Sequence, residues 1–369
     1  MYVYKFNSNN NLEYEYDGKK YELKPTLIRP LGPIVFRWGG EYSPILTGPM
    51  NKGSSEPLPL PSTIAGFLYW ISKGYTNEEL KELDIQKDYD TISSKVEVFG
   101  PFFYVKDENR KICLAIHQYP KKLRVINKEC EVPIPCKKPS ITEEEKRVFE
   151  PVYINKIGIG HEISKKQAHT GLIYTVEYVD YYATAVERLG LKEVKEYGIL
   201  VYTNADIKEG FYPFGSEGRL VEIREVKDKD LIKNALNNVF DYSIYILSPI
   251  ILRSHSNSSS SHTGTSLDID DIIIDKGNNE EIKMSDLAFK NVRLSLIGLG
   301  FNVKYNVKRP IYLAIMPGGF EAKNDKEKEK VKQLPRKLLN QISSGTKVIK
   351  LGLFDKIWGS MIIKGDGDG

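Results

Sequence analysis

Residues 57–70 read PLPLPSTIAGFLYW: three prolines at alternate positions, a Ser-Thr pair, and then an apolar run interrupted by one glycine. Apolar residues in and just after this run recur at i, i+3, i+4 and i+7, the spacing of one helix face: Ile64, Phe67, Leu68 and Ile71. We therefore expect the first clear helix to follow Pro61. Ser62 is its predicted N-cap, and its apolar face should pack on a sheet.

The residues at the mouth of this helix suggest a binding role. Alternate prolines hold a loop in an extended form of low entropy. Ser62 and Thr63 place hydroxyls and unpaired amides at a helix N-terminus, which attracts phosphate, although a plain cap after a connector also explains them. Gly66 costs about 1 kcal/mol relative to alanine in a helix. It therefore predicts close contact with a strand or a ligand backbone.

The segments around this helix are mainly strand-like. Short β-like runs alternate with Gly, Pro and Asn over the first 50 residues, and LIYTVEYVDYYATAV at 172–186 is a predicted strand. The second half repeats this pattern. The predominance of predicted strands, with few helices, favours an α+β fold over a doubly wound parallel sheet. We place a domain boundary at the polar segment that begins at residue 227, which gives domains of 1–226 and 227–369.

Composition sets broad limits on function. The chain has 369 residues, 41% hydrophobic and 28% charged, which is typical of a soluble globular protein. It lacks the run of about 18 apolar residues that a membrane helix needs and the pattern of a secretory leader, so we expect a cytoplasmic protein. The net charge of +4 permits a polyanionic partner without identifying one.

The sequence predicts no metal and no cofactor. Cys113, Cys130 and Cys136 lack the paired spacing of a zinc site, and we interpret them as reduced thiols. The histidines do not pair at metal-ligand spacing. The stretch GPMNKGSS is similar to a phosphate loop, but Lys52 precedes Gly53 instead of following it. A nucleotide-binding phosphotransferase therefore remains only a distant alternative.

Two further stretches carry candidate binding residues. His161 and His169 flank a basic stretch with Lys165 and Lys166, on what we expect to be a loop or hairpin tip; a solvated loop explains them equally well. In FGSEGRL, two glycines followed by Arg219 would let the backbone approach a partner while the guanidinium binds a phosphate.

In this order, the motifs resemble a known family: the third subunit of the Cmr-type (type III-B) CRISPR effector complex, in the RAMP superfamily of guide-RNA-binding proteins. The resemblance spans most of the chain. It rests on LIRPLGPIVFRWG at 27–39, PLPLPSTIAGFLYW at 57–70, HTGLIYTVEYV at 169–179, FGSEGRLVEI at 214–223 and RPIYLAIMPGGF at 309–320.

The resemblance implies two ferredoxin-like, RRM-related domains with antiparallel sheets and long insertions. It also implies a non-catalytic subunit that caps the repeat-derived 5′ tag of the guide RNA (crRNA) and joins the large signalling subunit to the backbone subunits. Single-stranded RNA of this kind is held by amides, basic residues and stacking side chains.

The resemblance also suggests which residues contact RNA. Ser62 and Thr63 would bind a phosphate at the helix mouth, and Gly215, Ser216 and Gly218 would lie against the RNA backbone. Arg219 would pair with phosphate or stack on a base. The remaining candidates fall in two groups. Arg37, Trp38 and Lys52 would complete the groove, and an inserted hairpin would carry His161, Lys165, Lys166 and His169.

The sequence departs from the family at three places. Ser216 stands where a further glycine is expected, no serine follows the glycines of MPGGF, and the Ser-rich stretch 254–266 looks like an insertion. The nearest alternative is the superfamily's metal-independent precursor-RNA endoribonuclease, which usually needs a general base such as histidine. No histidine precedes His117, although His161 or His169 could substitute.

Overall fold

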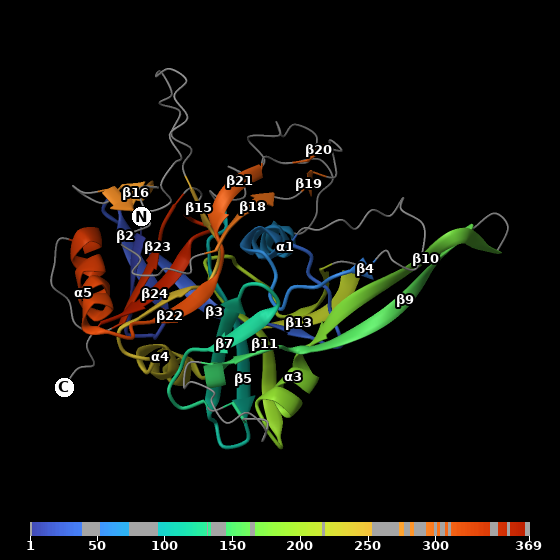
Figure 1. Cartoon of the computed structure of the whole chain (residues 1–369), viewed down its shortest axis with the longest axis horizontal. Helices are drawn as coiled ribbons and strands as arrows, with labels where there is room; N and C mark the ends of the chain where they lie inside the picture. Colours follow the sequence, from blue (N-terminus) through green and yellow to red (C-terminus); the bar gives the residue numbers. More distant parts are fainter. Residues whose placement is uncertain are drawn as a thin grey trace.

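A computed structural model of the chain gives the fold (Figure 1). It describes residues 2–38, 52–73, 95–130, 132–133, 145–162, 167–215, 218–252, 273–276, 281–283, 293–298, 301–302, 307–308, 311–339, 346–352 and 355–365. For residues 52, 145, 159–162, 167–174, 273–276, 281–283, 301–302, 307–308 and 335–339 it describes the backbone alone.

Strands predominate in both halves of the chain. Those of the first half are β1 (Tyr2–Phe6), β2 (Leu12–Tyr16), β3 (Lys19–Pro30), β4 (Lys52–Gly53), β5 (Val98–Asp107), β6 (Ile112–Gln118), β7 (Lys122–Val125), β8 (Val148–Phe149), β9 (Val152–Glu162), β10 (Gln167–Asp180), β11 (Val194–Thr203), β12 (Gly210–Phe214) and β13 (Arg219–Glu225). The described helices of the first half are α1 (Pro61–Lys73), a 3-10 turn (Glu145–Arg147) and α3 (Tyr181–Arg188).

The second half has two described α-helices, α4 (Lys229–Asn237) and α5 (Asp325–Leu339). Its strands are β14 (Ser243–Ile246), β15 (Ile250–Ile251), β16 (Ile273–Lys276), β17 (Glu281–Lys283), β18 (Leu294–Gly298), β19 (Phe301–Asn302), β20 (Val307–Lys308), β21 (Ile311–Ile315), β22 (Gly318–Glu321), β23 (Thr346–Lys350) and β24 (Ser360–Lys364).

One large sheet runs through both halves. Its strand order is β22-β14-β24-β23-β1-β2-β3-β11-β5-β6-β7-β8, and the β12–β13 hairpin joins it through β3. The two halves meet where β1 pairs antiparallel with β23. Among the described strands, only the short β4–β10 ladder is parallel. The predicted α+β class with antiparallel sheets is confirmed, whereas two ferredoxin-like domains divided at 226/227 stay a prediction.

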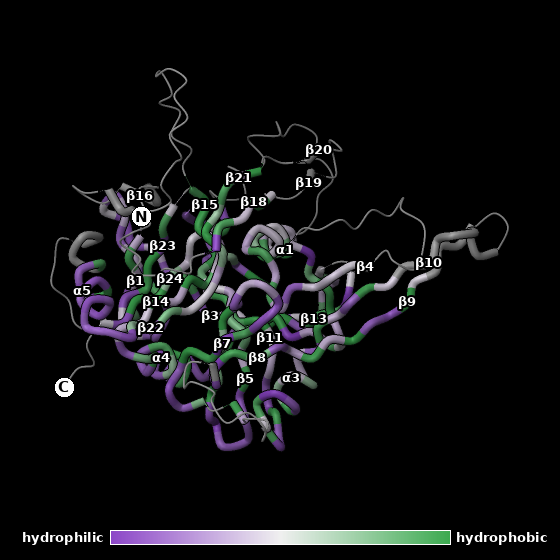
Figure 2. Tube along the Cα trace, viewed as in Figure 1, coloured by the Kyte–Doolittle hydropathy of each residue, from purple (hydrophilic) through white to green (hydrophobic). Residues whose placement is uncertain are grey.

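The central strands are buried on both faces. On β5, Phe103 and Val105 join the core beneath α1 and α3, whereas Phe102 and Tyr104 join the core beneath α4. This explains why the strand reads as a continuous apolar run instead of alternating. Hydrophobic residues follow the central strands, and α5 is largely hydrophilic (Figure 2).

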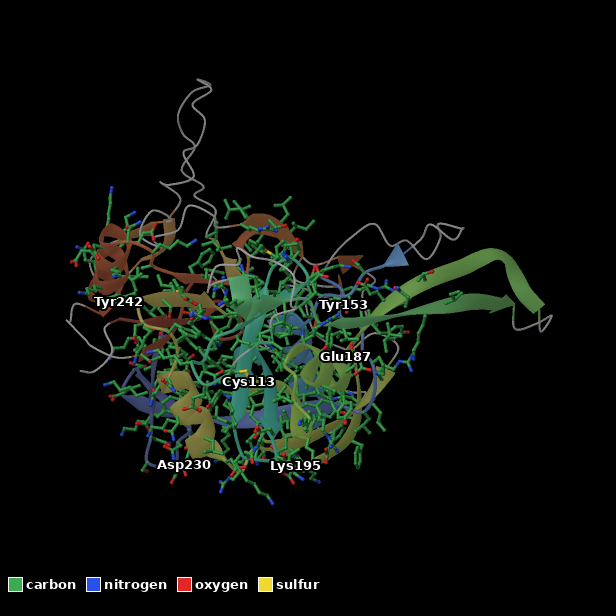
Figure 3. All side chains as sticks on the ribbon, turned by 60° about the horizontal axis from the view of Figure 1, so that its bottom comes forward. Cys113, Tyr153, Glu187, Lys195, Asp230 and Tyr242 are labelled. Atoms are coloured by element: carbon green, nitrogen blue, oxygen red, sulfur yellow. A yellow bond between two sulfur atoms is a disulfide. The ribbon has the colours of Figure 1, made fainter. Side chains whose placement is uncertain are left out.

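Two expectations for the first half are wrong. The predicted strand at 172–186 ends at Asp180, whose carboxylate accepts the amide hydrogen of Ala183 and so begins α3. Cys113 and Cys130 are joined in a disulfide (Figure 3) instead of being reduced, because the turn after β7 brings their Cα atoms to 5.3 Å. Cys136 lies outside the described residues.

Candidate nucleic-acid interface

The stretch FGSEGRL forms the turn of the β12–β13 hairpin. Gly215 and Gly218 have φ of +72° and +57°, a region that side chains rarely adopt. A Cβ on Gly215 would lie 3.3 Å from the carbonyl oxygen of Val35. Gly215 is therefore required by the turn and by its close approach to the chain's own 33–38 segment. Ser216 lies outside the described residues.

Arg219 stands at the exit of this turn, beside the strand β10. Its guanidinium carbon lies 5.0 Å from the ring centroid of Tyr178, and its Nη2 donates to the Tyr178 hydroxyl over 3.3 Å. The exposed Lys156 on β9 places its ammonium 5.1 Å from the same ring centroid. Tyr178 itself is buried, so this ring holds two cations next to the glycine turn.

Helix α1 packs against the glycine-rich hairpin through aromatic rings. The ring centroids of Phe67 and Phe214 are 4.3 Å apart, and those of Trp70 and Tyr212 are 6.3 Å apart. Phe36 completes the contact with Phe214 at 5.6 Å. The two motifs singled out in the sequence, although separated by about 150 residues, therefore meet in space.

The start of α1 differs from the prediction. The carbonyl oxygen of Leu60 accepts the amide hydrogens of Thr63 and Ile64, so the helix begins at Pro61 and Ser62 is inside its first turn. Proline is favoured at this first helical position because its missing N–H would have no partner there. Ser62 is half-buried and Thr63 is exposed, so Thr63 presents its hydroxyl to solvent.

Gly66 does not mark a contact within the described chain. A Cβ built on it meets no atom within 4 Å, so the predicted approach of a strand is wrong. The half-buried position on α1 leaves room for a methyl group.

The alternate prolines belong to a buried strap, residues 53–61, that leads into α1. Proline has no amide hydrogen, so a strap rich in proline has fewer backbone donors to satisfy when it is buried. Its carbonyls receive side-chain donors: the Tyr181 hydroxyl bonds to Pro57 over 2.5 Å, and the Trp38 indole N–H bonds to Leu58 over 2.7 Å. The prolines of this strap thus favour its burial.

Trp38 is consequently part of the protein's packing. Besides its bond to Leu58, its ring packs edge-on against His117 with centroids 4.4 Å apart. The neighbouring Arg37 is half-buried. Lys52 lies on β4, where its backbone pairs with Thr175 of β10, and its side chain is outside the description.

A polar cluster fixes the strap to the base of the β9–β10 hairpin. Glu56 accepts from His117 Nε2 at 3.0 Å and from the backbone amide of Lys121 at 2.8 Å. The Lys121 ammonium lies 2.6 Å from a carboxylate oxygen of Glu177. Burial lowers the pKa of His117, against the raising effect of Glu56. Because the Glu56 carboxylate can only accept, the contact with Glu56 places a hydrogen on Nε2 of His117.

Strands β9 and β10 form a long hairpin arm that projects from the body (Figure 1), with Tyr153 at its root (Figure 3). The backbone of His161 pairs with Ala168, and His169 follows on β10. Lys165 and Lys166 lie outside the described residues. The expected hairpin is confirmed for the backbone of His161 and His169, whose side chains are not described.

The structure thus brings together the glycine turn, Arg219, helix α1 and the base of the arm, and leaves His161 and His169 toward the arm's far end. Lys156 and Tyr178 were missed in the sequence. Alternation along a strand indicates which face of the sheet Lys156 and Tyr178 occupy, but it does not indicate that Arg219 is their neighbour. Among the described residues, no group of three or more His, Cys, Asp or Glu could hold a metal ion. No described helix is long and apolar enough to cross a membrane.

No family model matches the chain. A curated protein named CRISPR system CMR subunit Cmr3, from Saccharolobus solfataricus, is 25% identical over 317 residues, covering 80% of this chain and 85% of the relative. The resemblance to the Cmr3 family is thereby confirmed. Two solved chains from cryo-EM structures of the type III-B Cmr-beta complex bound to cognate target RNA, one of them also with AMPPnP, are also similar in structure. Their TM-scores are 0.48 and 0.45 and their identities 18% and 17%; they cover 80% and 83% of this chain, and 85% and 94% of the solved chains are covered.

Proposed function

We propose that this chain is a non-catalytic guide-RNA-binding subunit of a type III-B CRISPR ribonucleoprotein and caps the 5′ tag of the crRNA in antiviral defence. The observation that carries the proposal is the sequence similarity to Cmr3, which spans 80% of the chain. In this role it joins the large signalling subunit to the backbone subunits. The two halves, 1–226 and 227–369, correspond to two ferredoxin-like domains that share one sheet.

The geometry around the glycine turn supports RNA binding. Two cations, Arg219 and Lys156, lie over one tyrosine ring next to the glycine turn. Phosphate groups are attracted by such cations, and a backbone without side chains admits a close approach. We assign Gly215, Ser216 and Gly218 to the RNA backbone and Arg219 to a phosphate.

The other candidates take four different roles. Thr63 and Ser62 bind a phosphate at the mouth of α1, and His161, Lys165, Lys166 and His169 contact the guide from the arm. Arg37 and Lys52 supply charge to the groove. Trp38 supports the 33–38 segment, because its N–H donates to the Leu58 carbonyl and its ring contacts His117.

The endoribonuclease alternative requires an accessible base. His117 is fully buried and hydrogen-bonded to Glu56, so it cannot reach an RNA 2′-hydroxyl without unfolding its surroundings. His161 or His169 on the arm would have to serve. Incubating the protein with repeat RNA in EDTA tests this: cleavage that is lost in His161→Ala or His169→Ala would support the enzyme.

The phosphotransferase alternative requires a phosphate loop that opens a helix. Here Lys52 and Gly53 form the short strand β4, and the strap separates them from the start of α1 at Pro61. We expect no binding of ATP with Mg²⁺ in isothermal titration calorimetry.

The deciding experiment is to purify the affinity-tagged protein gently from its host and to sequence the RNA that accompanies it. We expect short guide RNAs that share one repeat-derived 5′ end, together with other subunits of the complex. A protein that is recovered without RNA and without these subunits would refute the proposed function.

A further inference from the structure

The turn between β6 and β7, residues 118–121, contacts parts of the chain that lie far away in the sequence. Two of its contacts reach the second half. The amide of Tyr119 donates to the Pro317 carbonyl over 3.1 Å, and Oε1 of Gln118 accepts the amide hydrogen of Gly319 over 2.8 Å. The turn therefore holds the glycines of the MPGGF motif. We call residues 118–121 the joint turn.

Lys121, the last residue of the joint turn, binds both strands of the arm. Its ammonium lies 2.6 Å from a carboxylate oxygen of Glu177 on β10, and its carbonyl oxygen accepts the Tyr153 hydroxyl of β9 over 3.2 Å. The ammonium also lies 5.5 Å from the centroid of the Tyr153 ring. The amide of Lys121 donates to Glu56 in the strap over 2.8 Å. One residue thus joins the arm to the strap through its amide, its carbonyl and its ammonium.

The ion pair of Lys121 lies at a partly buried site. The side chain of Glu177 is 8% exposed and that of Lys121 is 36% exposed. Such a pair is screened by salt much less than a fully exposed one. Glu177 also accepts the amide hydrogen of Ser55 over 3.3 Å, so the same carboxylate holds β10 to the strap a second time. The contacts at the root of the arm therefore give it a defined direction.

The arm depends on its root for that direction. A two-stranded hairpin is only marginally stable by itself. Among the described strands, only the two-residue β4 pairs with the arm beyond its own ladder, and the arm extends away from the body (Figure 1). The strap that Lys121 binds leads directly into α1 at Pro61. The joint turn thus sets the arm's angle relative to the mouth of α1.

We propose that Lys121 is a positioning residue that fixes the arm at one angle to α1 and the glycine turn. Its consequence for RNA rests on the proposed function, which assigns both the arm and the glycine turn to the guide RNA. At the fixed angle, both contacts meet one RNA strand together. A preformed angle avoids the cost of ordering the arm when RNA binds. Lys121 acts through Glu177 and Tyr153.

The test first measures the direction of the arm without RNA. Nitroxide labels on His161→Cys, toward the far end of the arm, and Lys195→Cys, an exposed position on β11, report the distance between arm and body by double electron–electron resonance. The full-length chain carries Cys136→Ser, and the disulfide-bonded pair does not react with the label. Because a strand rises about 3.3 Å per residue, His161 lies about 26 Å beyond Tyr153, and a swing of about 20° would move it by roughly 9 Å.

We expect a narrow distance distribution in the wild type and a broad or displaced one in Lys121→Met. Lys121→Arg keeps the cation and should restore the wild-type distribution. Lys121→Met/Glu177→Gln removes both charges, so it replaces the single variant if a buried carboxylate without this cation prevents folding. Lys111→Met removes an exposed lysine beside the β5–β6 turn and is the matched control, which should change nothing.

The consequence for RNA is measured on unlabelled chains. Fluorescence anisotropy with a synthetic RNA that carries the host's 5′ tag should show binding about tenfold weaker in Lys121→Met, because the arm must then be ordered on binding. Lys121→Arg and Lys111→Met should bind within about twofold of the wild type, a difference well below the cost of ordering the arm.

Three outcomes would overturn the inference: a distance distribution that neither Lys121→Met nor the double variant changes, a distribution that Lys121→Arg does not restore, or a wild-type distribution as broad as that of Lys121→Met. The first would remain decisive if the melting temperature fell, because Lys121 would then only stabilise the fold. A wild-type chain with a narrow distribution that binds no tag RNA would instead refute the proposed function and leave the positioning of the arm in place.

Discussion

Arg219 combines an internal contact with the proposed external one. Its guanidinium carbon lies 5.0 Å from the ring centroid of Tyr178, and a planar guanidinium group suits recognition of phosphate. Arg219→Ala should weaken binding of tag RNA about tenfold and make the slope of log K against log salt less steep by about 0.7, the value for one phosphate on a single strand. Fluorescence anisotropy titrations between about 50 and 200 mM salt measure both the affinity and the salt slope. This range should change the affinity roughly tenfold or more.

Two variants control this experiment. Arg219→Lys keeps the charge and should keep the salt slope while losing affinity, because lysine lacks the planar guanidinium. Arg188→Ala removes an exposed arginine from the last turn of α3 and should change neither quantity. An unchanged slope in Arg219→Ala would exclude the phosphate contact.

Gly66 is a position at which we expect a substitution to stabilise the protein. Because it lies inside α1 and a Cβ there meets nothing within 4 Å, Gly66→Ala should stabilise the protein by about 0.5–1 kcal/mol in urea unfolding. If RNA lies against this part of the helix, the same change should weaken RNA binding.

Gly319 is the matched comparison. A Cβ there would lie 2.4 Å from Cδ of Arg124 and 2.7 Å from the Tyr245 ring, so Gly319→Ala should destabilise the protein by about 1–3 kcal/mol. A loss of stability in Gly66→Ala as well would show that its surroundings are tighter than the structure describes.

At the scale of elements, variants in the first turn of α1 can distinguish an RNA-binding role of Ser62 and Thr63 from a helix-capping role. Since Ser62 lies inside the helix and Leu60 accepts the first amides, alanine at Ser62 and Thr63 should not incur the loss of about 1 kcal/mol that follows removal of an N-cap. We expect the double variant to melt as the wild type does and to bind tag RNA less tightly. A drop in melting temperature with unchanged RNA affinity would assign the hydroxyls a purely structural role.

The Cys113–Cys130 disulfide ties the turn after β7 to β6. It closes a loop of 17 residues, and its removal by Cys130→Ser should lower the free energy of unfolding by about 2–4 kcal/mol. Thiol titration of the denatured, unreduced protein should detect one free cysteine, Cys136. Three reactive thiols would contradict the bridge.

The sequence predicted elements better than their partners. Apolar spacing correctly predicted α1 after Pro61, and residues 172–180 of the predicted strand at 172–186 belong to β10. The strand-like reading of 181–186 failed because one cap, Asp180, began a helix within a tyrosine-rich run. The contacts of Trp38 with Leu58 and His117 could not be predicted, because no local pattern indicates either partner. Periodicity gives the face of a side chain, whereas long-range pairing decides what that face meets.

At the scale of the whole molecule, buried polar groups at the junction of the two halves make each half depend on the other. The carboxylate of Glu97 accepts from the hydroxyls of Tyr4 and Tyr14, and the ammonium of Lys350 on β23 lies 3.9 Å from it. Lys350 also donates to the Lys356 carbonyl. These groups are buried where β1 meets β23, so either half alone would leave some of them without partners.

This junction predicts a specific pH dependence. Burial lowers the pKa of Lys350 to about 8, against the raising effects of Glu97 and Asp355. In the unfolded chain the lysine keeps its proton to about pH 10.4, so between these values the unfolded state binds more protons and stability rises with pH. Urea unfolding of the wild type should therefore show a free energy that increases from pH 8 to 9.5.

Lys350→Met should abolish this increase, because it removes the group whose pKa differs between the folded and unfolded states. Lys347→Met, a half-buried lysine on the same strand β23, should leave it in place. The measurement stops below pH 10, because burial raises the pKa of Tyr4 and Tyr14, and such tyrosines make stability fall with pH above that point. If the free energy of unfolding increased by the same amount in the wild type and in Lys350→Met, Lys350 would not be the cause of the pH dependence.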